Sequence, residues 1–127
     1  MKNFLFCFTL LLGFIATAQK GAKIHFAHSE NTIDYGTIKK GSDNGVREVN
    51  FTNKGDEALE IISVQSTSGI TIMSKPISAI GPGKSDKIVL KYNMALGPIR
   101  KTITIETNAV NYPEGRVAIK LKGDVEN

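Results

Sequence analysis

Residues 87–105 read KIVLKYNMALGPIRKTITI, and this stretch decides the fold. Apolar and polar residues alternate in both of its halves, as in Leu90-Lys91-Tyr92 and Ile103-Thr104-Ile105. Successive side chains of a β-strand point to opposite faces, so this alternation predicts two strands, each with one apolar face. Gly97-Pro98 lies between them and predicts a turn.

The same alternation continues on both sides of this stretch, with turn residues about every ten positions. No window shows the i, i+3, i+4, i+7 stripe of a helix. We therefore expect an all-β fold, an immunoglobulin-like sandwich of about seven antiparallel strands. A closed small barrel, which uses the same alternation, is the alternative. The expected core comprises Phe51, Leu59, Ile61, Ile88, Leu90, Ile103, Ile105, Val117, Ile119 and Leu121.

Several connections carry local signals of their own. The turn residues 53–56 (Asn-Lys-Gly-Asp) predict a hairpin between two strands. The apolar pattern changes phase by one residue between Ile61 and Ile62, which predicts a bulge. We expect Ile77 and Ile80 to cover one end of the sandwich.

Residues 1–18 have the form of a cleavable signal peptide. A positively charged start at Lys2 precedes a run of thirteen apolar or neutral residues, Phe4–Ala16. The residues Ala16-Thr17-Ala18 form an A-x-A cleavage site. The run is shorter than the roughly 20 apolar residues that a membrane span needs. Cleavage after Ala18 would leave one domain, residues 19–127, and a buried N-terminal helix is the alternative.

Export predicts a protein of the periplasm or the extracellular space, without a stable membrane span. The only cysteine, Cys7, lies inside the apolar run and is not placed for lipid attachment. Cleavage removes it, so no disulfide can form and stability must come from the core. Removal of Lys2 changes the formal charge from +4 to +3.

Several phrases, taken in order, resemble a family of exported bacterial immunoglobulin-like domains, the domain of unknown function 1573. The resemblance extends from Phe26 to Val125. It implies a fold related in shape to major sperm protein, hydin-type and pilus-chaperone sandwiches, and an interaction module without an established reaction. The phrases are residues 33–38 with Gly41, 49–55, 59–61, 80–85 and 101–108.

One phrase departs from that family. Its members usually carry Cys-Gly-Cys-Thr after the third strand, and the matching residues here are Ser68-Gly69-Ile70-Thr71. Neither serine nor isoleucine provides a thiolate, so redox or metal chemistry is not implied for this chain. A tight bend at Gly69 remains expected.

No residue pattern indicates an enzyme, a metal site or a cofactor. His25 and His28, three positions apart on a strand, point to opposite faces and cannot chelate one ion together. The Gly-Lys-Ser of residues 81–85 lacks the first glycine of a phosphate loop and precedes a strand, so we expect a strand-entry turn. Residues 42–45 are expected to form a polar turn. Nucleic-acid binding is not expected, because no phrase interleaves aromatic and basic residues.

These observations predict a non-catalytic interaction or assembly module of the bacterial cell envelope, whose partner is an unidentified envelope protein. Neither the partner nor the oligomeric state follows from the sequence. The candidate partner-binding residues are Ser68, Gly69, Ile70, Asn111, Tyr112 and Pro113.

Two alternatives concern other ligands. One is a carbohydrate-binding or adhesin domain, in which Tyr112 would stack on a sugar. The other is an anionic partner held by outward-facing cations, which equally suit a solvated face where lysines prevent edge-to-edge pairing. These cations are Lys87, Lys91, Arg116, Lys120 and Lys122.

Overall fold

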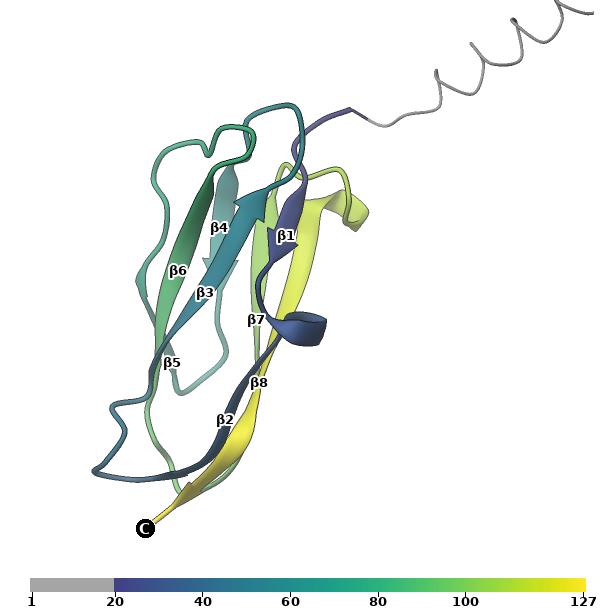
Figure 1. Ribbon diagram of the computed structural model, residues 1–127. Coiled ribbons are helices and arrows are strands. Elements are labelled where there is room, and N and C mark those ends of the chain that lie inside the picture. Colours follow the sequence, from purple (N-terminus) through teal and green to yellow (C-terminus); the bar gives the residue numbers. More distant parts are fainter. Residues whose placement is uncertain (1–19) are drawn as a thin grey trace, which may run out of the picture.

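The computed structural model describes residues 20–127 (Figure 1). The predicted signal peptide, including Cys7 and the cleavage site at Ala18, lies outside the described residues. The described chain forms strands and two short 3-10 turns, η1 (Ser29–Asn31) and η2 (Pro113–Gly115). The strands are β1 (Ile24–Phe26), β2 (Thr32–Lys39), β3 (Val46–Asn53), β4 (Ile61–Gln65), β5 (Ile70–Ser74), β6 (Ser85–Tyr92), β7 (Gly97–Thr107) and β8 (Arg116–Glu126).

The strands form two four-stranded sheets. Sheet A has the order β1-β3-β6-β5, and sheet B has the order β2-β8-β7-β4. They pack face to face, as Figure 1 shows, so the predicted all-β immunoglobulin-like sandwich is confirmed.

One strand pair differs from the expected antiparallel pattern, because β2 pairs with β8 in parallel. β1 belongs to sheet A, where it pairs with β3, and the chain then passes through η1 to sheet B. β2 keeps the direction of β1 after this crossing and therefore runs parallel to β8. The division of this N-terminal segment between two sheets also raises the strand count to eight.

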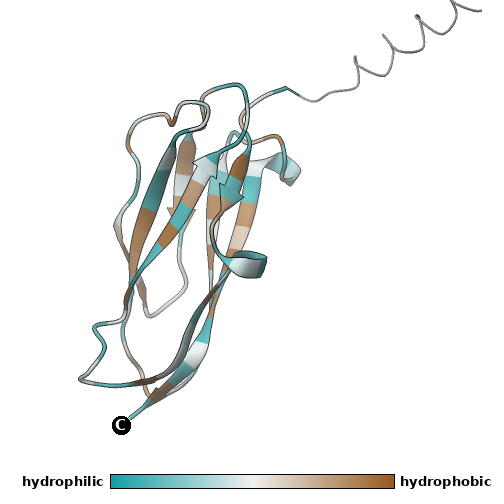
Figure 2. Ribbon diagram, in the orientation of Figure 1, coloured by the Kyte–Doolittle hydropathy of each residue, from teal (hydrophilic) through white to brown (hydrophobic). Residues whose placement is uncertain are grey.

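The core consists of the inward faces of both sheets, and Figure 2 shows the alternation along the strands. All but one of the expected core side chains are buried, and Ile61, half-buried, packs against them. The polar residues between them, such as Lys87 and Lys91, are exposed. Burial of each large aliphatic side chain contributes about 1.5–3 kcal/mol before the conformational entropy is subtracted.

The predicted hairpin at residues 53–56 is wrong. β3 has β1 on one side and β6 on the other, so neither of its edges is free for β4. The turn instead carries the chain from sheet A to β4 in sheet B. Asn53 is completely buried there, and its Oδ1 accepts a hydrogen bond from the Gly55 N–H at 2.9 Å.

The expected cover of the sandwich end is half right. Ile80 is buried, since its backbone forms two 2.8 Å hydrogen bonds with Leu59 that turn its side chain inward. Ile77 is 97% exposed, so its assignment to the core is wrong. It lies in the connection after β5, where residues 75–79 form no strand that would direct it inward.

Candidate functional site

The first group of candidate residues, Ser68, Gly69 and Ile70, forms the turn from β4 into β5. Gly69 has φ +89°, which favours glycine, and its carbonyl accepts a 2.9 Å hydrogen bond from the Asn93 N–H. A Cβ at Gly69 would press against the Asn93 amide. Ile70 is buried and pairs with Tyr92 at the end of β6. The tight bend is therefore present without the cysteines.

The second group, Asn111, Tyr112 and Pro113, precedes and enters η2. The Asn111 side chain pairs with the backbone of Ile24, accepting from its N–H at 3.0 Å and donating to its carbonyl at 2.9 Å. The Tyr112 hydroxyl accepts a 3.0 Å hydrogen bond from Asn31, and its ring meets the edge of Phe26. These contacts attach β1 and η1 to the body of the sandwich.

The two groups lie at opposite ends of the sandwich and do not form one site. Asn111 contacts Ile24, which pairs with Asn53 at one end of β3. Gly69 contacts Asn93, just beyond Tyr92, and Tyr92 N–H bonds to Gly45 near the other end of β3. Partner binding by either group stays a prediction.

A cluster that the sequence analysis missed joins the β2–β3 connection to the core. The Arg47 guanidinium forms two hydrogen bonds with the Asp43 carboxylate, at 2.8 and 3.1 Å, and lies 4.2 Å from the Tyr35 ring centre. The Tyr35 hydroxyl and Tyr92 N–H both donate to the Gly45 carbonyl. The hydrogen bond from Arg47 lowers the pKa of Asp43. The four-residue spacing of Asp43 and Arg47 was the available signal.

Replacement of Tyr35 by phenylalanine tests this cluster through the dependence of its stability on pH in the alkaline range. Burial raises the pKa of Tyr35 to about 12, although the Arg47 charge acts in the opposite direction. In the unfolded chain the hydroxyl ionises near pH 10, so the stabilisation by Tyr35 is complete below pH 10 and is lost as the pH rises towards 12. We expect the difference in unfolding free energy between wild type and Tyr35→Phe to shrink over that interval in urea titrations. A difference independent of pH would contradict the assignment.

Of the four large apolar side chains that are exposed within residues 20–127, three lie on or next to the edge strands β4 and β5. β4 and β5 are the last strands of sheets B and A, on the side where residues 66–69 connect them. Each strand has an irregularity, and each irregularity leaves one large side chain in solvent, Ile62 at 60% and Met73 at 55% exposure. The phase change predicted at Ile61–Ile62 is thus confirmed as a bulge.

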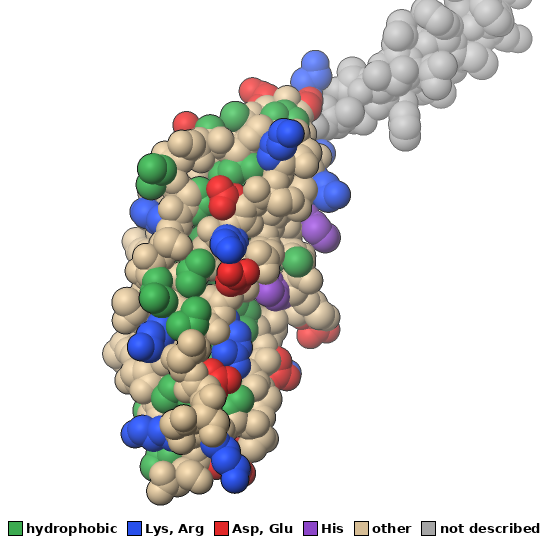
Figure 3. Space-filling view, turned by 60° about the vertical axis from the view of Figure 1, so that its left-hand side comes forward, with side chains coloured by type: hydrophobic (Ala, Val, Ile, Leu, Met, Phe, Trp, Pro, Cys, Tyr) green, Lys and Arg blue, Asp and Glu red, His purple; other side chains and the backbone are tan. Residues whose placement is uncertain are grey.

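A small hollow of about 160 Å³ lies next to β4. It is lined by Glu60, Ile61, Ile62 and residues 76–79, among them the almost fully exposed Ile77. We call the surface formed by β4, β5 and residues 75–79 the β4–β5 flank. Figure 3 brings the side of β5 and β6 forward and shows hydrophobic side chains at its surface among basic and acidic ones.

The other features considered in the sequence are the two histidines, the Gly-Lys-Ser turn, and possible metal sites and membrane spans. Within residues 20–127, no group of His, Cys, Asp or Glu is arranged to hold a metal ion. His28 Nε2 accepts a hydrogen bond from the Asn50 N–H at 3.1 Å, and the His25 side chain is exposed. Residues 81–84 form the expected turn into β6. The part of the chain that the structure describes contains no helix long and apolar enough to cross a membrane.

Comparison with solved structures shows which other proteins share this fold. A protein of unknown function from Porphyromonas gingivalis W83 has a TM-score of 0.66 and 18% identity, over 85% of this chain and 49% of that one. The YadV chaperone has a TM-score of 0.57 and 22% identity, over 83% of this chain and 53% of that one. PapD-like domain 7 of human CEP192 has a TM-score of 0.56 and 12% identity, over 87% of this chain and 92% of that one. At these identities the likeness shows the fold alone.

The chain spans about half the length of the first two of these proteins. No curated protein matches its sequence. Residues 26–125 match the family described as "Protein of unknown function (DUF1573)", and the chain therefore belongs to that family, as the phrases in its sequence indicated.

Proposed function

We propose that this protein is an exported, non-catalytic module of the bacterial cell envelope that binds another protein along the β4–β5 flank. The observation that carries the proposal is the pair of edge strands, IISVQ in β4 and ITIMS in β5, which contain neither charge nor proline. Ile62, Met73 and Ile77 stand exposed on the same flank.

Unprotected sheet edges are surfaces to which other chains bind. An edge strand has unpaired N–H and C=O groups, and proteins usually protect such strands with charges, prolines or short length. Here β1 has only three residues, and β2 carries Asp34 and Lys39. The edges on the β4–β5 flank carry no charge and no proline and have only a bulge in each strand, which leaves them more open to a partner strand than β1 or β2.

The exposed isoleucines add an apolar contribution to such an interface. Burial of a side chain as exposed as Ile77 contributes about 1.5–3 kcal/mol. Ile62 lines the same hollow, so one apolar side chain of a partner could contact both residues. A few such contacts usually provide most of the binding energy of a protein interface.

Export is part of the proposal and rests on the signal-peptide form of residues 1–18. The fold is shared with the YadV chaperone, so this scaffold is compatible with protein binding. The alternative of sugar stacking on Tyr112 has less support. That side chain is half-buried, with its ring against Phe26 and its hydroxyl bound by Asn31.

Site-specific photo-crosslinking in the native cell tests the proposal. A photoreactive residue at position 62 or 77 is expected to attach one and the same envelope protein, identified by mass spectrometry. Ile62→Asp and Ile77→Asp should each reduce recovery of that protein at least about tenfold. Their melting temperatures should stay near wild type, because both side chains are exposed.

Leu96→Asp is the matched control, because Leu96 is also a half-exposed aliphatic side chain but lies outside the hollow, just before β7. We expect this variant to retain the partner. Equal loss with Leu96→Asp, equal crosslinking from position 96, or hydrolase activity of the purified protein without any specific crosslink would refute the proposed function.

A further inference from the structure

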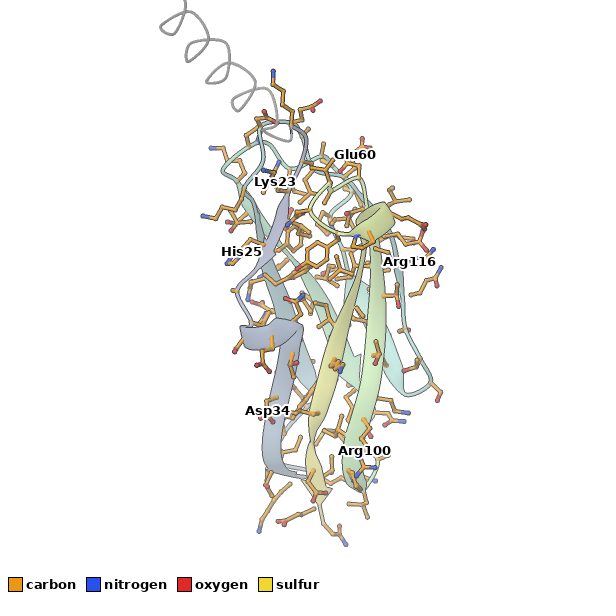
Figure 4. All side chains as sticks on the ribbon, turned by 90° about the vertical axis from the view of Figure 1, so that its right-hand side faces the viewer. Lys23, His25, Asp34, Glu60, Arg100 and Arg116 are labelled. Carbon is orange, nitrogen blue, oxygen red and sulfur yellow. The ribbon has the colours of Figure 1, made fainter. Side chains whose placement is uncertain are left out.

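A second surface lies on the outer face of sheet B, away from the β4–β5 flank. A shallow hollow of about 450 Å³ is bounded by β7, β8 and the start of β2. Its lining includes the cations Arg100, Lys101, Lys120 and Lys122 and a single acidic residue, Glu30. Figure 4 faces this sheet and shows Arg100 on the lower half of β7, with Asp34 on β2 to its left.

The cations of this hollow are cross-strand neighbours. Arg100 pairs with Lys122, and Thr102 pairs with Lys120 on the next outward-facing rung. Like charges directly opposite each other destabilise a sheet. The structure thus keeps an arrangement that costs stability, and an anion bound between the two cations would reverse the sign of that interaction.

Protection of a sheet edge does not account for these residues. β8 and β7 are the two central strands of sheet B, and each is paired on both sides. Lysines that prevent edge-to-edge pairing belong on edge strands. The interpretation of Lys120 and Lys122 as edge protection, left open by the sequence, therefore does not fit their position.

Most of the positive charge in the hollow is not neutralised by the protein. Lys122 has Asp34 at 3.8 Å, and both side chains are more than half exposed. Within residues 20–127 no ion pair involves Arg100, Lys101 or Lys120. Arg100 and Lys120, on the outward-facing rungs, are thus available to a ligand, whereas Lys101 lies on the rung between them, opposite the buried Leu121.

We propose that this hollow binds an acidic polysaccharide through carboxylate or other anionic groups on successive sugars. The two rungs lie about 7 Å apart along the strands, so they can hold two neighbouring anionic groups. Thr32 and Thr102 also line the hollow and provide hydroxyls for sugar oxygens.

The lining disfavours two other polyanionic partners, nucleic acid and an anionic membrane. It contains no aromatic side chain on which nucleic-acid bases could stack. It also contains none of the exposed large hydrophobic side chains, which a membrane-binding surface would insert into the lipid. A flexible, hydrated chain with regularly spaced charges fits this surface better than either.

Binding of polyuronate oligosaccharides to the purified protein, expressed from the full chain, tests the inference. We expect binding at low ionic strength that weakens as salt is added, and none to neutral dextran. Arg100→Gln and Lys120→Gln should each raise the Kd about fivefold. Lys91→Gln, which removes the same charge from an exposed position on β6 in sheet A, should change it less than about twofold.

Three results would overturn this inference. They are no binding at low salt, equal weakening by Lys91→Gln, and tighter binding of oligo-dT or of phosphatidylglycerol vesicles than of polyuronate. Thermal melts of each variant confirm that the fold is retained. The flank variants Ile62→Asp and Ile77→Asp should leave polyuronate binding unchanged, so this test is independent of the proposed function.

Discussion

Replacement of Asn53 by alanine is expected to lower the free energy of unfolding by about 3–5 kcal/mol. Asn53 is completely buried at the crossing from sheet A to sheet B. Its Nδ2 donates to the carbonyls of Glu57 at 2.8 Å and Ile80 at 2.9 Å, and its Oδ1 accepts from the N–H groups of Gly55 and Lys23. Truncation would leave several of these groups without a partner, at about 1–3 kcal/mol for each one that stays buried.

Urea unfolding followed by circular dichroism measures this loss. Asn50→Ala, an exposed position on the same strand, is the control and should change stability by less than about 1 kcal/mol. Asn53→Asp should be as destabilising as alanine, because it removes both donors and buries a charge. If Asn53→Ala lost less than 1 kcal/mol, the side chain would not be what holds the crossing together.

Replacement of Ile103 by alanine is expected to lower the free energy of unfolding by about 2–5 kcal/mol. Ile103 lies in the middle of β7, is completely buried, and pairs with the equally buried Ile119 of β8. Removal of its side-chain carbons loses their burial and leaves a cavity between the two sheets. Ile103→Val, which removes one methyl group, should cost about 0.5–1.5 kcal/mol.

Thr104→Ala is the control for this prediction, since Thr104 is the next residue and points to the other face of sheet B. It should cost less than about 1 kcal/mol, the range of strand propensities. A shift of register by one residue exchanges the two faces of a strand. A greater loss at Thr104 than at Ile103 would therefore show that the inward face of β7 has been assigned wrongly.

The polar contacts that hold the connections together were less accessible from the sequence than the core. Asn53 was read as part of a hairpin turn, and the contact between Arg47 and Tyr35 was not expected. Such contacts join residues from different segments of the chain, and neither a buried asparagine nor an Arg–Tyr contact has a pattern in the local sequence. The candidate residues at Tyr112 were found in the sequence, but its contact with Phe26, which reduces its exposure, was not.

For the β4–β5 flank and the basic hollow, too, the strands follow from the local sequence but their arrangement in space does not. The strands β4 and β5 and the bulge in β4 follow from local pattern, but their position at the edges of two sheets does not. Arg100 and Lys122 lie 22 positions apart in the chain and become neighbours only through the pairing of β7 with β8. Neither the apolar flank nor the basic hollow is visible in any short stretch.

The sequence by itself determined the fold class, the inward face of most strands and the family. These properties follow from the alternation of apolar and polar residues and from the turn residues, both of which are local features. Burial of one face of a strand requires an apolar residue at every second position. Only the tertiary structure decided the parallel pairing of β2 with β8, the crossing at residues 53–56 and the exposure of Ile77. These depend on which strand edges are already occupied, a property of contacts between residues far apart in the chain that no local pattern records.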